Sequence, residues 1–208
     1  RHSKFDKVKG ADDLNFHTPA LTLDNTQMIW MLQDETSRIP VPQVDLYFNY
    51  RIDPAELKDK LNIEIDGKKT DFNIITASAD NKISVRITGL TKPEDKNYET
   101  RITVEKGLKP EEGKNKTAEE IISTLSMPSP YVLTIQSIEA EHDGQDGMVT
   151  VTTSQQLTGE SLNTLLKVDP AVKFTTELTD NGFMLTSPSF DVEKSYSLVI
   201  SQGLRGKI

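Results

Sequence analysis

Several residue types that often carry protein chemistry are scarce or missing in this chain of 208 residues. It has no cysteine, which excludes disulfides, thiolate metal sites and cysteine nucleophiles. Its three histidines, His2, His17 and His142, lie too far apart in sequence to form a local zinc motif. No apolar run approaches the roughly 20 residues of a membrane-spanning helix. We therefore expect no metal site on the histidines.

Sequence motifs of enzymes are also missing. The chain contains neither the GxSxG elbow of a serine hydrolase nor the GxGxxG and GxxxxGK[ST] loops that hold phosphates. Three adjacent carboxylate pairs are present, but neighbouring side chains diverge on a strand and on a helix, which favours solvated charge. These pairs are Asp12-Asp13, Glu111-Glu112 and Glu119-Glu120. The sequence predicts no catalytic residue, no cofactor site and no enzymatic activity.

The charge balance restricts the partners. The chain has 24 basic and 32 acidic residues, a net charge of −8 and a pI near 5.0. Such a chain repels phosphates and anionic lipid heads, so we expect it to contact neither nucleic acid nor membrane. With 35% hydrophobic and 27% charged residues, the composition is that of a globular protein. The length exceeds a common single domain of about 100–150 residues, which favours two modules.

An internal repeat supports two modules and gives their boundaries. Residues 44–63 align without a gap on residues 149–168. Six apolar positions match, namely Val44, Leu46, Ile52, Leu57, Leu61 and Ile63 with Val149, Val151, Leu157, Leu162, Leu166 and Val168. A second match joins TVEKGL, ending at Leu108, to VISQGL, ending at Leu204. The repeat predicts one module in residues 1–116 and another in residues 130–208.

The local patterns predict an all-β fold. Apolar residues alternate with polar ones around residues 44–48, 98–104, 149–151 and 196–200, as in half-buried strands. Hairpins are expected over residues 71–88 and 173–187, turning at residues 79–81 and 180–182. Short crossover helices are expected at residues 53–57 and 158–162, the first with Asp53 as N-cap and Pro54 at N1. Residues 14–33 and 131–141 are expected to supply the opening strands of the two modules.

Residues 117–129 are predicted to be the linker between the modules. The stretch from Lys109 to Pro130 is charged at first and ends between prolines. Thr117 and Glu120 have the spacing of a helical capping box, so a brief helix is expected inside the linker.

Each unit of the repeat combines "DPAEL"-type and "GLKxxEG"-type motifs, and in this it resembles bacterial immunoglobulin-like modules. The match covers residues 42–113 and, more loosely, residues 146–208. Two such modules in series are similar to the N-terminal region of bacterial alpha-2-macroglobulin-like proteins of the Bacteroidetes type. The resemblance implies two immunoglobulin-like β-sandwiches from an exported, envelope-attached or periplasmic protease inhibitor.

In that family a bait segment is cleaved and a thioester captures the protease, but no residue of this chain matches either part. The resemblance therefore implies a structural module whose partners are neighbouring domains of the same chain and, indirectly, proteases. The opening residues contain no initiator Met and no signal sequence, so we expect the chain to begin inside a longer gene. The alternative is a spacer or glycan-binding pair of modules from a bacterial surface adhesin.

Three local features have both a structural and a functional interpretation. Residues Glu141 to Gly147 could gather oxygens around Ca²⁺, although a polar strand-connecting turn is favoured. Trp30 could stack on a sugar if exposed, but its five-residue apolar run favours a buried strand. Tyr98 and Tyr196 fit the tyrosine corner, in which a phenol near the start of a late strand bonds back to the backbone.

Overall fold

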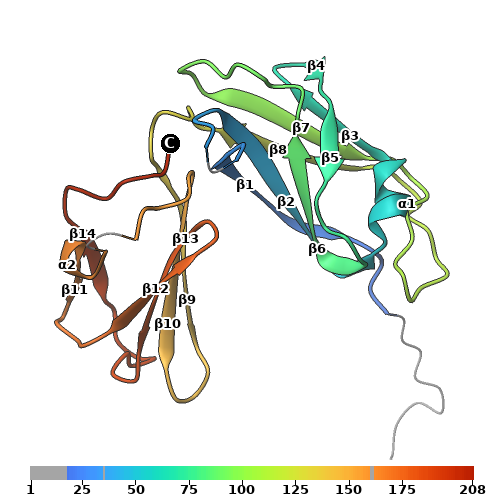
Figure 1. The fold of residues 1–208 in the computed structure, drawn as a ribbon. Helices are drawn as coiled ribbons and strands as arrows, with labels where there is room; N and C mark the ends of the chain where they lie inside the picture. The colour runs from blue at the N-terminus through green and yellow to red at the C-terminus, as the bar shows by residue number, and fades with distance from the viewer. Residues whose placement is uncertain (1–17, 35, 160–161) are drawn as a thin grey trace, which may run out of the picture.

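The computed structural model describes residues 18–34, 36–159 and 162–208 (Figure 1). Antiparallel strands arranged in several sheets make up most of the ordered structure, which confirms the all-β fold class. No helix in these ranges is long and apolar enough to cross a membrane. His2, His17, Asp12-Asp13 and the first part of the predicted opening strand lie outside the described residues.

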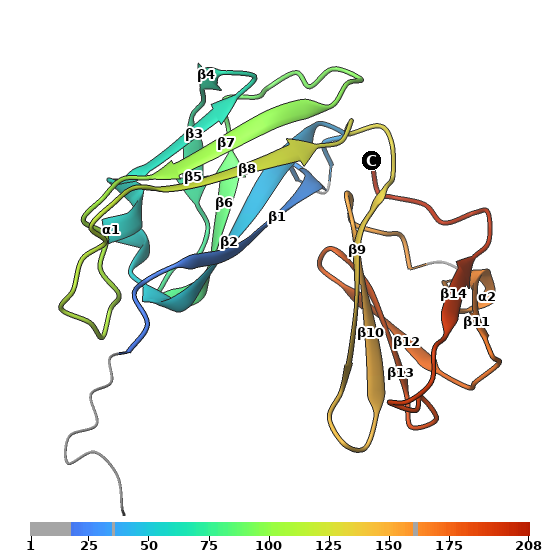
Figure 2. The same cartoon turned by 180° about the vertical axis from the view of Figure 1, so that it is seen from behind.

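The first sandwich is built from two four-stranded sheets. One sheet has the order β1-β2-β6-β5, with β1 at Leu23–Leu32, β2 at Pro40–Ile52, β6 at Asp80–Ile87 and β5 at Phe72–Ile74. The other has the order β4-β3-β7-β8, with β4 at Lys68–Lys69, β3 at Leu61–Ile65, β7 at Tyr98–Val104 and β8 at Ile121–Met127. Figure 2 shows β8 running beside β7 on the side of β1.

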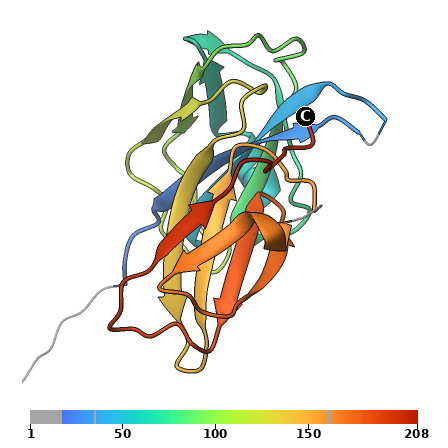
Figure 3. The same cartoon turned by 90° about the vertical axis from the view of Figure 1, so that its left-hand side faces the viewer.

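The second sandwich pairs a four-stranded sheet with a two-stranded one. The larger sheet has the order β9-β10-β13-β12, with β9 at Ile135–His142, β10 at Gly147–Thr153, β13 at Gly182–Ser187 and β12 at Thr175–Thr179. The smaller one joins β11 at Leu166–Asp169 to β14 at Ser197–Ile200. Figure 3 shows this pair in front of the larger sheet.

The first predicted crossover helix forms at the expected place, and a helix near the second begins later than predicted, because residues 158 and 159 are not helical. In α1 (Pro54–Lys58) the Asp53 carboxylate accepts a hydrogen bond from Ala55 N at 2.9 Å, and Pro54 occupies the first turn, as expected. Leu57 is the buried residue of this helix. In the second sandwich, α2 covers Leu162–Leu165, and the part of the prediction at residues 160–161 lies outside the described residues.

Most of the buried apolar side chains fall into two clusters, one in each sandwich. The core residues expected for the first sandwich are all fully buried, namely Leu46, Leu57, Ile63, Ile102 and Val104. In the second, Val151, Leu162 and Val168 are buried as expected. Leu198 and Ile200, expected to be buried like Ile102 and Val104, are only half-buried, so that prediction is wrong for these two residues.

The predicted linker is also wrong, because most of residues 117–129 belong to the first sandwich. Residues 121–127 form β8, which pairs with β7 from Tyr98↔Met127 to Val104↔Ile121. Thr117 caps no helix: its Oγ1 accepts hydrogen bonds from Gly107 N at 2.9 Å and Leu108 N at 3.1 Å. Pairing with a distant strand therefore prevails over the local capping pattern, and the connection between the sandwiches follows Met127.

Both predicted hairpins form. In the second sandwich, Thr179 pairs with Gly182, so Asp180 and Asn181 make the turn as predicted. In the first, Ile75 N donates to Ser84 O at 2.8 Å, so the hairpin connection spans residues 76–83 and includes the predicted turn at residues 79–81. The strand β6 already begins at Asp80 because Asp80 pairs with Ile52 of β2.

Candidate functional site at the junction of the two sandwiches

Trp30 lies at the centre of the junction. Its side chain is fully buried in the first core, and its Nε1 donates to Pro128 O at 2.8 Å. Its backbone N donates to Ser154 O of the second sandwich at 2.7 Å, and Trp30 forms a parallel bridge with Gln155. A tryptophan without an exposed ring offers no stacking surface for a sugar, so Trp30 is a core and junction residue.

The connecting segment is held on its first-sandwich side. Ser129 Oγ donates to the Asp95 carboxylate at 2.6 Å, and Ser129 N donates to Asn97 Oδ1 at 3.0 Å. Tyr131 Oη donates to Pro93 O at 3.3 Å. The loop before β7 therefore anchors the chain as it leaves the first sandwich.

The same segment is held from the second sandwich by buried polar side chains. Gln155 is 3% exposed, and its Nε2 donates to Pro130 O at 2.8 Å. Ser154 Oγ donates to Val132 O at 3.2 Å, and Ser154 N donates to Thr134 O at 2.9 Å. A buried carbonyl that loses its donor is costly, so these bonds oppose bending at the connection.

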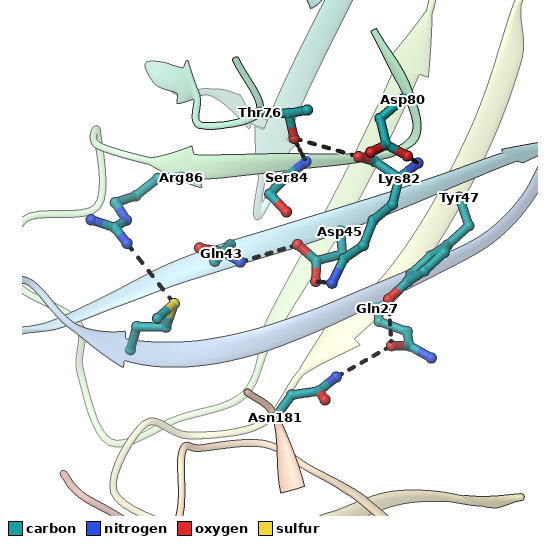
Figure 4. A network of polar contacts seen from close by, with 11 residues as sticks. Gln27, Gln43, Asp45, Tyr47, Thr76, Asp80, Lys82, Ser84, Arg86 and Asn181 are labelled. Atoms are coloured by element: carbon teal, nitrogen blue, oxygen red, sulfur yellow. Dashed lines mark hydrogen bonds and ion pairs between the residues drawn. The ribbon is translucent and has the colours of Figure 1, made fainter. Parts of the chain in front are cut away.

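A polar network on the outer face of the first sandwich reaches the second (Figure 4). Asp45 is buried and pairs with Lys82 Nζ at 3.0 Å, while Lys82 lies 5.6 Å from the centre of the Tyr47 ring. Tyr47 Oη donates to Gln27 Oε1 at 3.3 Å. Asn181 Nδ2, from the β12–β13 turn, donates to the same oxygen at 3.4 Å. One chain of contacts thus joins the two sandwiches.

The electrostatics of this network favour structure over catalysis. Burial works to lower the pKa of Lys82, but the hydrogen bond and charge of Asp45 outweigh it, and the pKa of Lys82 is raised. Burial raises the pKa of Tyr47, partly offset by Lys82. Lys82 therefore stays charged and Tyr47 stays protonated at neutral pH, and neither is an activated nucleophile or base.

A cleft of about 460 Å³ lies between the sandwiches, and residues of both line it. Asn25, Gln27 and Asn97 come from the first sandwich, and Gln136 and Glu139 from the second. Amide and hydroxyl groups dominate the lining, and Glu139 is its one titratable side chain. The cleft is therefore a largely polar seam between the sandwiches.

The predicted ligand cluster is the turn of the β9–β10 hairpin, as its structural interpretation expected. His142 pairs with Gly147, and the Asp143 carboxylate accepts hydrogen bonds from Gln145 N and Asp146 N, both at 2.8 Å. These backbone bonds lower the pKa of Asp143. Within the described ranges, no three His, Cys, Asp or Glu side chains are grouped so as to hold a metal. His142 Nδ1 accepts from Gly144 N at 2.9 Å.

Both tyrosines make the bonds predicted for a tyrosine corner. Tyr98 Oη accepts from Glu94 N and donates to Glu94 O. Tyr196 Oη accepts from Asp191 N at 3.0 Å and donates to Ser189 O at 3.3 Å. Each phenol therefore fastens the loop before its strand. The carboxylate pairs Glu111-Glu112 and Glu119-Glu120 are exposed.

Sequence reasoning missed most of the junction. Gln27, Asp45, Lys82 and Gln155 carry no motif, Asn181 was recognisable only as a turn residue, and the five are distributed over most of the chain. One signal was available, because Asp45 interrupts an apolar stretch with a charge.

Comparison with known protein families, curated proteins and solved structures finds no match to this chain.

Proposed function

We propose that this chain is a non-catalytic pair of immunoglobulin-like modules that holds a fixed geometry within a larger protein. The observation that carries the proposal is the junction, where Trp30 is fully buried and bonded to Pro128 on one side and to Ser154 on the other. A flexible spacer needs none of these buried contacts, whereas a rigid elbow depends on them.

The strand order supports the immunoglobulin-like assignment. Lettered along the chain, the strands of the first sandwich give the sheets A-B-E-D and C′-C-F-G. An immunoglobulin sandwich has the sheets A-B-E-D and C-F-G. In the second sandwich, β9-β10-β13-β12 again gives A-B-E-D, and β11 with β14 gives C-F.

Matching backbone contacts support a tandem repeat. Glu105 N donates to Lys60 O in the first sandwich, and Ser201 N donates to Leu165 O at the aligned positions of the second. Farther along, Glu111 N donates to Arg51 O as Lys207 N donates to Gln156 O. The glycines of the two GL motifs, Gly107 and Gly203, have φ angles of 92° and 117°, where a side chain would be strained.

The parent and its location come from the sequence resemblance. On that basis the pair belongs to the N-terminal region of an alpha-2-macroglobulin-like protease inhibitor in the bacterial envelope or periplasm. Its direct partners are then neighbouring domains of the same chain, and proteases are met only through the parent. The net charge of −8 supports the view that it binds neither nucleic acid nor membrane.

Rigidity is tested by residual dipolar couplings measured on the two sandwiches of the intact chain. One common alignment tensor is expected for both, and a Gln155→Ala variant should give two distinct tensors. Asn163→Ala, at an exposed position in α2 away from the junction, is the control and should keep one tensor. Two distinct tensors in the unmodified chain would contradict the rigid elbow.

Absence of protease inhibition is tested by incubation with trypsin-, elastase- and subtilisin-like proteases, using a small and a large substrate. No loss of protease activity is expected, because the sequence has no cysteine for a thioester and its three histidines are scattered, which argues against a Ser–His–acid arrangement. Stoichiometric inhibition by the uncleaved chain would reveal a self-contained inhibitor and defeat the proposal.

A further inference from the structure

The second sandwich is open at an edge where the first is closed. In the first, β8 pairs with β7 along its whole length. Thr26 Oγ1 of β1 and Ser123 Oγ of β8 share a hydrogen bond of 2.9 Å, so β8 also closes the gap to the other sheet. Within the part of the chain that the structure describes, no strand pairs with the corresponding edge of β14 (Figures 1 and 2).

The exposure of the strand residues follows this difference. Ile102 and Val104 of β7, beside β8, are fully buried. Leu198 and Ile200, which occupy the aligned positions of β14 and pair with β11 in the same register, remain half-buried. The second sandwich thus exposes apolar surface at the position where the first is covered by a strand.

A hollow of about 440 Å³ opens between the sheets beside β14. Its lining is mainly apolar and includes Ile138, Val149, Leu185, Phe190, Tyr196 and Leu198. Ile138 is 56% exposed, which is unusual for an isoleucine on the inner side of a sandwich. The hollow therefore provides the side-chain pockets that should accompany an open strand edge.

The backbone of β14 is oriented to receive a strand. Ser201 N donates to Leu165 O at 2.8 Å, so the alternation of an antiparallel ladder directs the N–H groups of Leu198 and Ile200 away from β11. The sequence of β14, Ser-Leu-Val-Ile, contains no charge and no proline. Edge strands that face solvent are usually protected from pairing by charged residues or proline, and β14 lacks this protection.

We propose that this edge and hollow bind one extended polypeptide strand with apolar side chains at alternate positions, antiparallel to β14. The inference rests on the proposed equivalence of the two sandwiches, because β8 defines the occupant. Ile121, Leu125 and Met127 of β8 contribute to the first core. By the aligned register, Ile200 would face the position of Ile121, and Tyr196 that of Leu125. Main-chain bonds would supply affinity, and the hollow would select the side chains.

The probe is a synthetic peptide with the sequence of residues 119–128, titrated into the intact chain and followed by ¹⁵N–¹H spectra. Shifts are expected at β9 and β14, with one peptide bound per chain. Ala140 is exposed and lines the hollow, so Ala140→Arg should weaken binding about tenfold or more by placing a charge there. Ala118→Arg, also exposed but in the first sandwich, is the matched control and should change binding less than about twofold.

Each contrary outcome overturns the inference. No shifts with about 1 mM peptide, while the spectrum shows a folded chain, would mean that the edge accepts no strand. Equal weakening by both arginine variants would place the peptide elsewhere. A dimer that masks β14 would make a second copy the occupant, and binding of a small apolar probe without the peptide would make the hollow a ligand pocket. Protease assays and dipolar couplings test the proposed function separately, so a failure of the proposed function can be distinguished from a failure of strand binding.

Discussion

The two sandwiches share a strand order and differ in how they are closed. The first has β8 across the gap between its sheets, and its aligned strand residues Ile102 and Val104 are fully buried. The second has a two-stranded sheet at the same place, and Leu198 and Ile200 are half-buried. The difference teaches that burial is set by the neighbour that covers a strand, even where the alternation of the strand itself is the same.

The largest expected effect comes from the aligned helix residues Leu57 and Leu162, which are 0% and 6% exposed. Truncation of Leu57 to Ala should cost about 2–5 kcal/mol, and truncation of Leu162 should fall at the low end, because an open core relaxes more easily. Urea unfolding separates the two, with Trp30 fluorescence reporting the first sandwich and methyl spectra the second. Losses below about 0.5 kcal/mol for both variants would refute the alignment.

A smaller effect is expected at the junction. Gln155→Ala removes the donor to Pro130 O and should cost about 1–3 kcal/mol, because the carbonyl is left unsatisfied in a buried place. The loss should appear mainly as uncoupling, so that the two sandwiches unfold at different urea concentrations. The neighbouring Gln156 is half-buried, and its side chain makes no hydrogen bond within the described residues. Gln156→Ala therefore serves as the control. If the two sandwiches of Gln155→Ala still unfold together, other contacts hold the junction.

The tyrosine corners give a finer comparison. Tyr98 is 4% exposed, whereas Tyr196 is half-buried. Removal of the phenol oxygen in Tyr98→Phe should cost about 0.5–1.5 kcal/mol, and Tyr196→Phe should cost less, because water can replace its bonds. Thermal unfolding of the two variants provides the measurement. A larger loss for Tyr196→Phe would show that the second corner is the more important one.

The smallest effect is a difference in alkaline sensitivity. The pKa of Lys82 is raised above its ordinary 10.5, and that of Tyr47 above 10.0. A raised pKa means that the folded state holds the proton more tightly than the unfolded state does. The stability that this adds is fully present below the ordinary pKa values and is lost as pH rises through the folded pKa. The aligned pair of the second sandwich, Thr152 and Gly182, cannot titrate.

The first sandwich should therefore lose stability above about pH 10 more steeply than the second, and Lys82→Met should reduce that slope. Urea midpoints measured between about pH 8 and pH 11, with Trp30 fluorescence for the first sandwich and methyl spectra for the second, check this expectation. If the urea midpoints of the two sandwiches fall with pH at the same rate, the network around Lys82 does not contribute to the stability of the first sandwich. Lys68→Met, an exposed lysine in β4, is the control for loss of charge alone.

The sequence by itself determined the local elements that depend on neighbouring residues. Asp53 and Pro54 specify the start of α1 through a cap and a preset φ angle. Alternation specifies the inward faces of β2, β7 and β10, and the Asp180-Asn181 pair specifies a tight hairpin. Tyr98 and Tyr196 were also recognisable, because each phenol bonds to a backbone only a few residues upstream.

Tertiary structure decided the features that depend on residues far apart in the chain. Residues 121–127 carry a helical capping signal just before them, yet they form β8 because β7 offers a complete ladder of partners. Trp30 joins the sandwiches through Pro128 and Ser154, which lie about a hundred residues away. Burial and hydrogen bonding between such distant segments depend on which surfaces meet, and no local pattern of side chains encodes that.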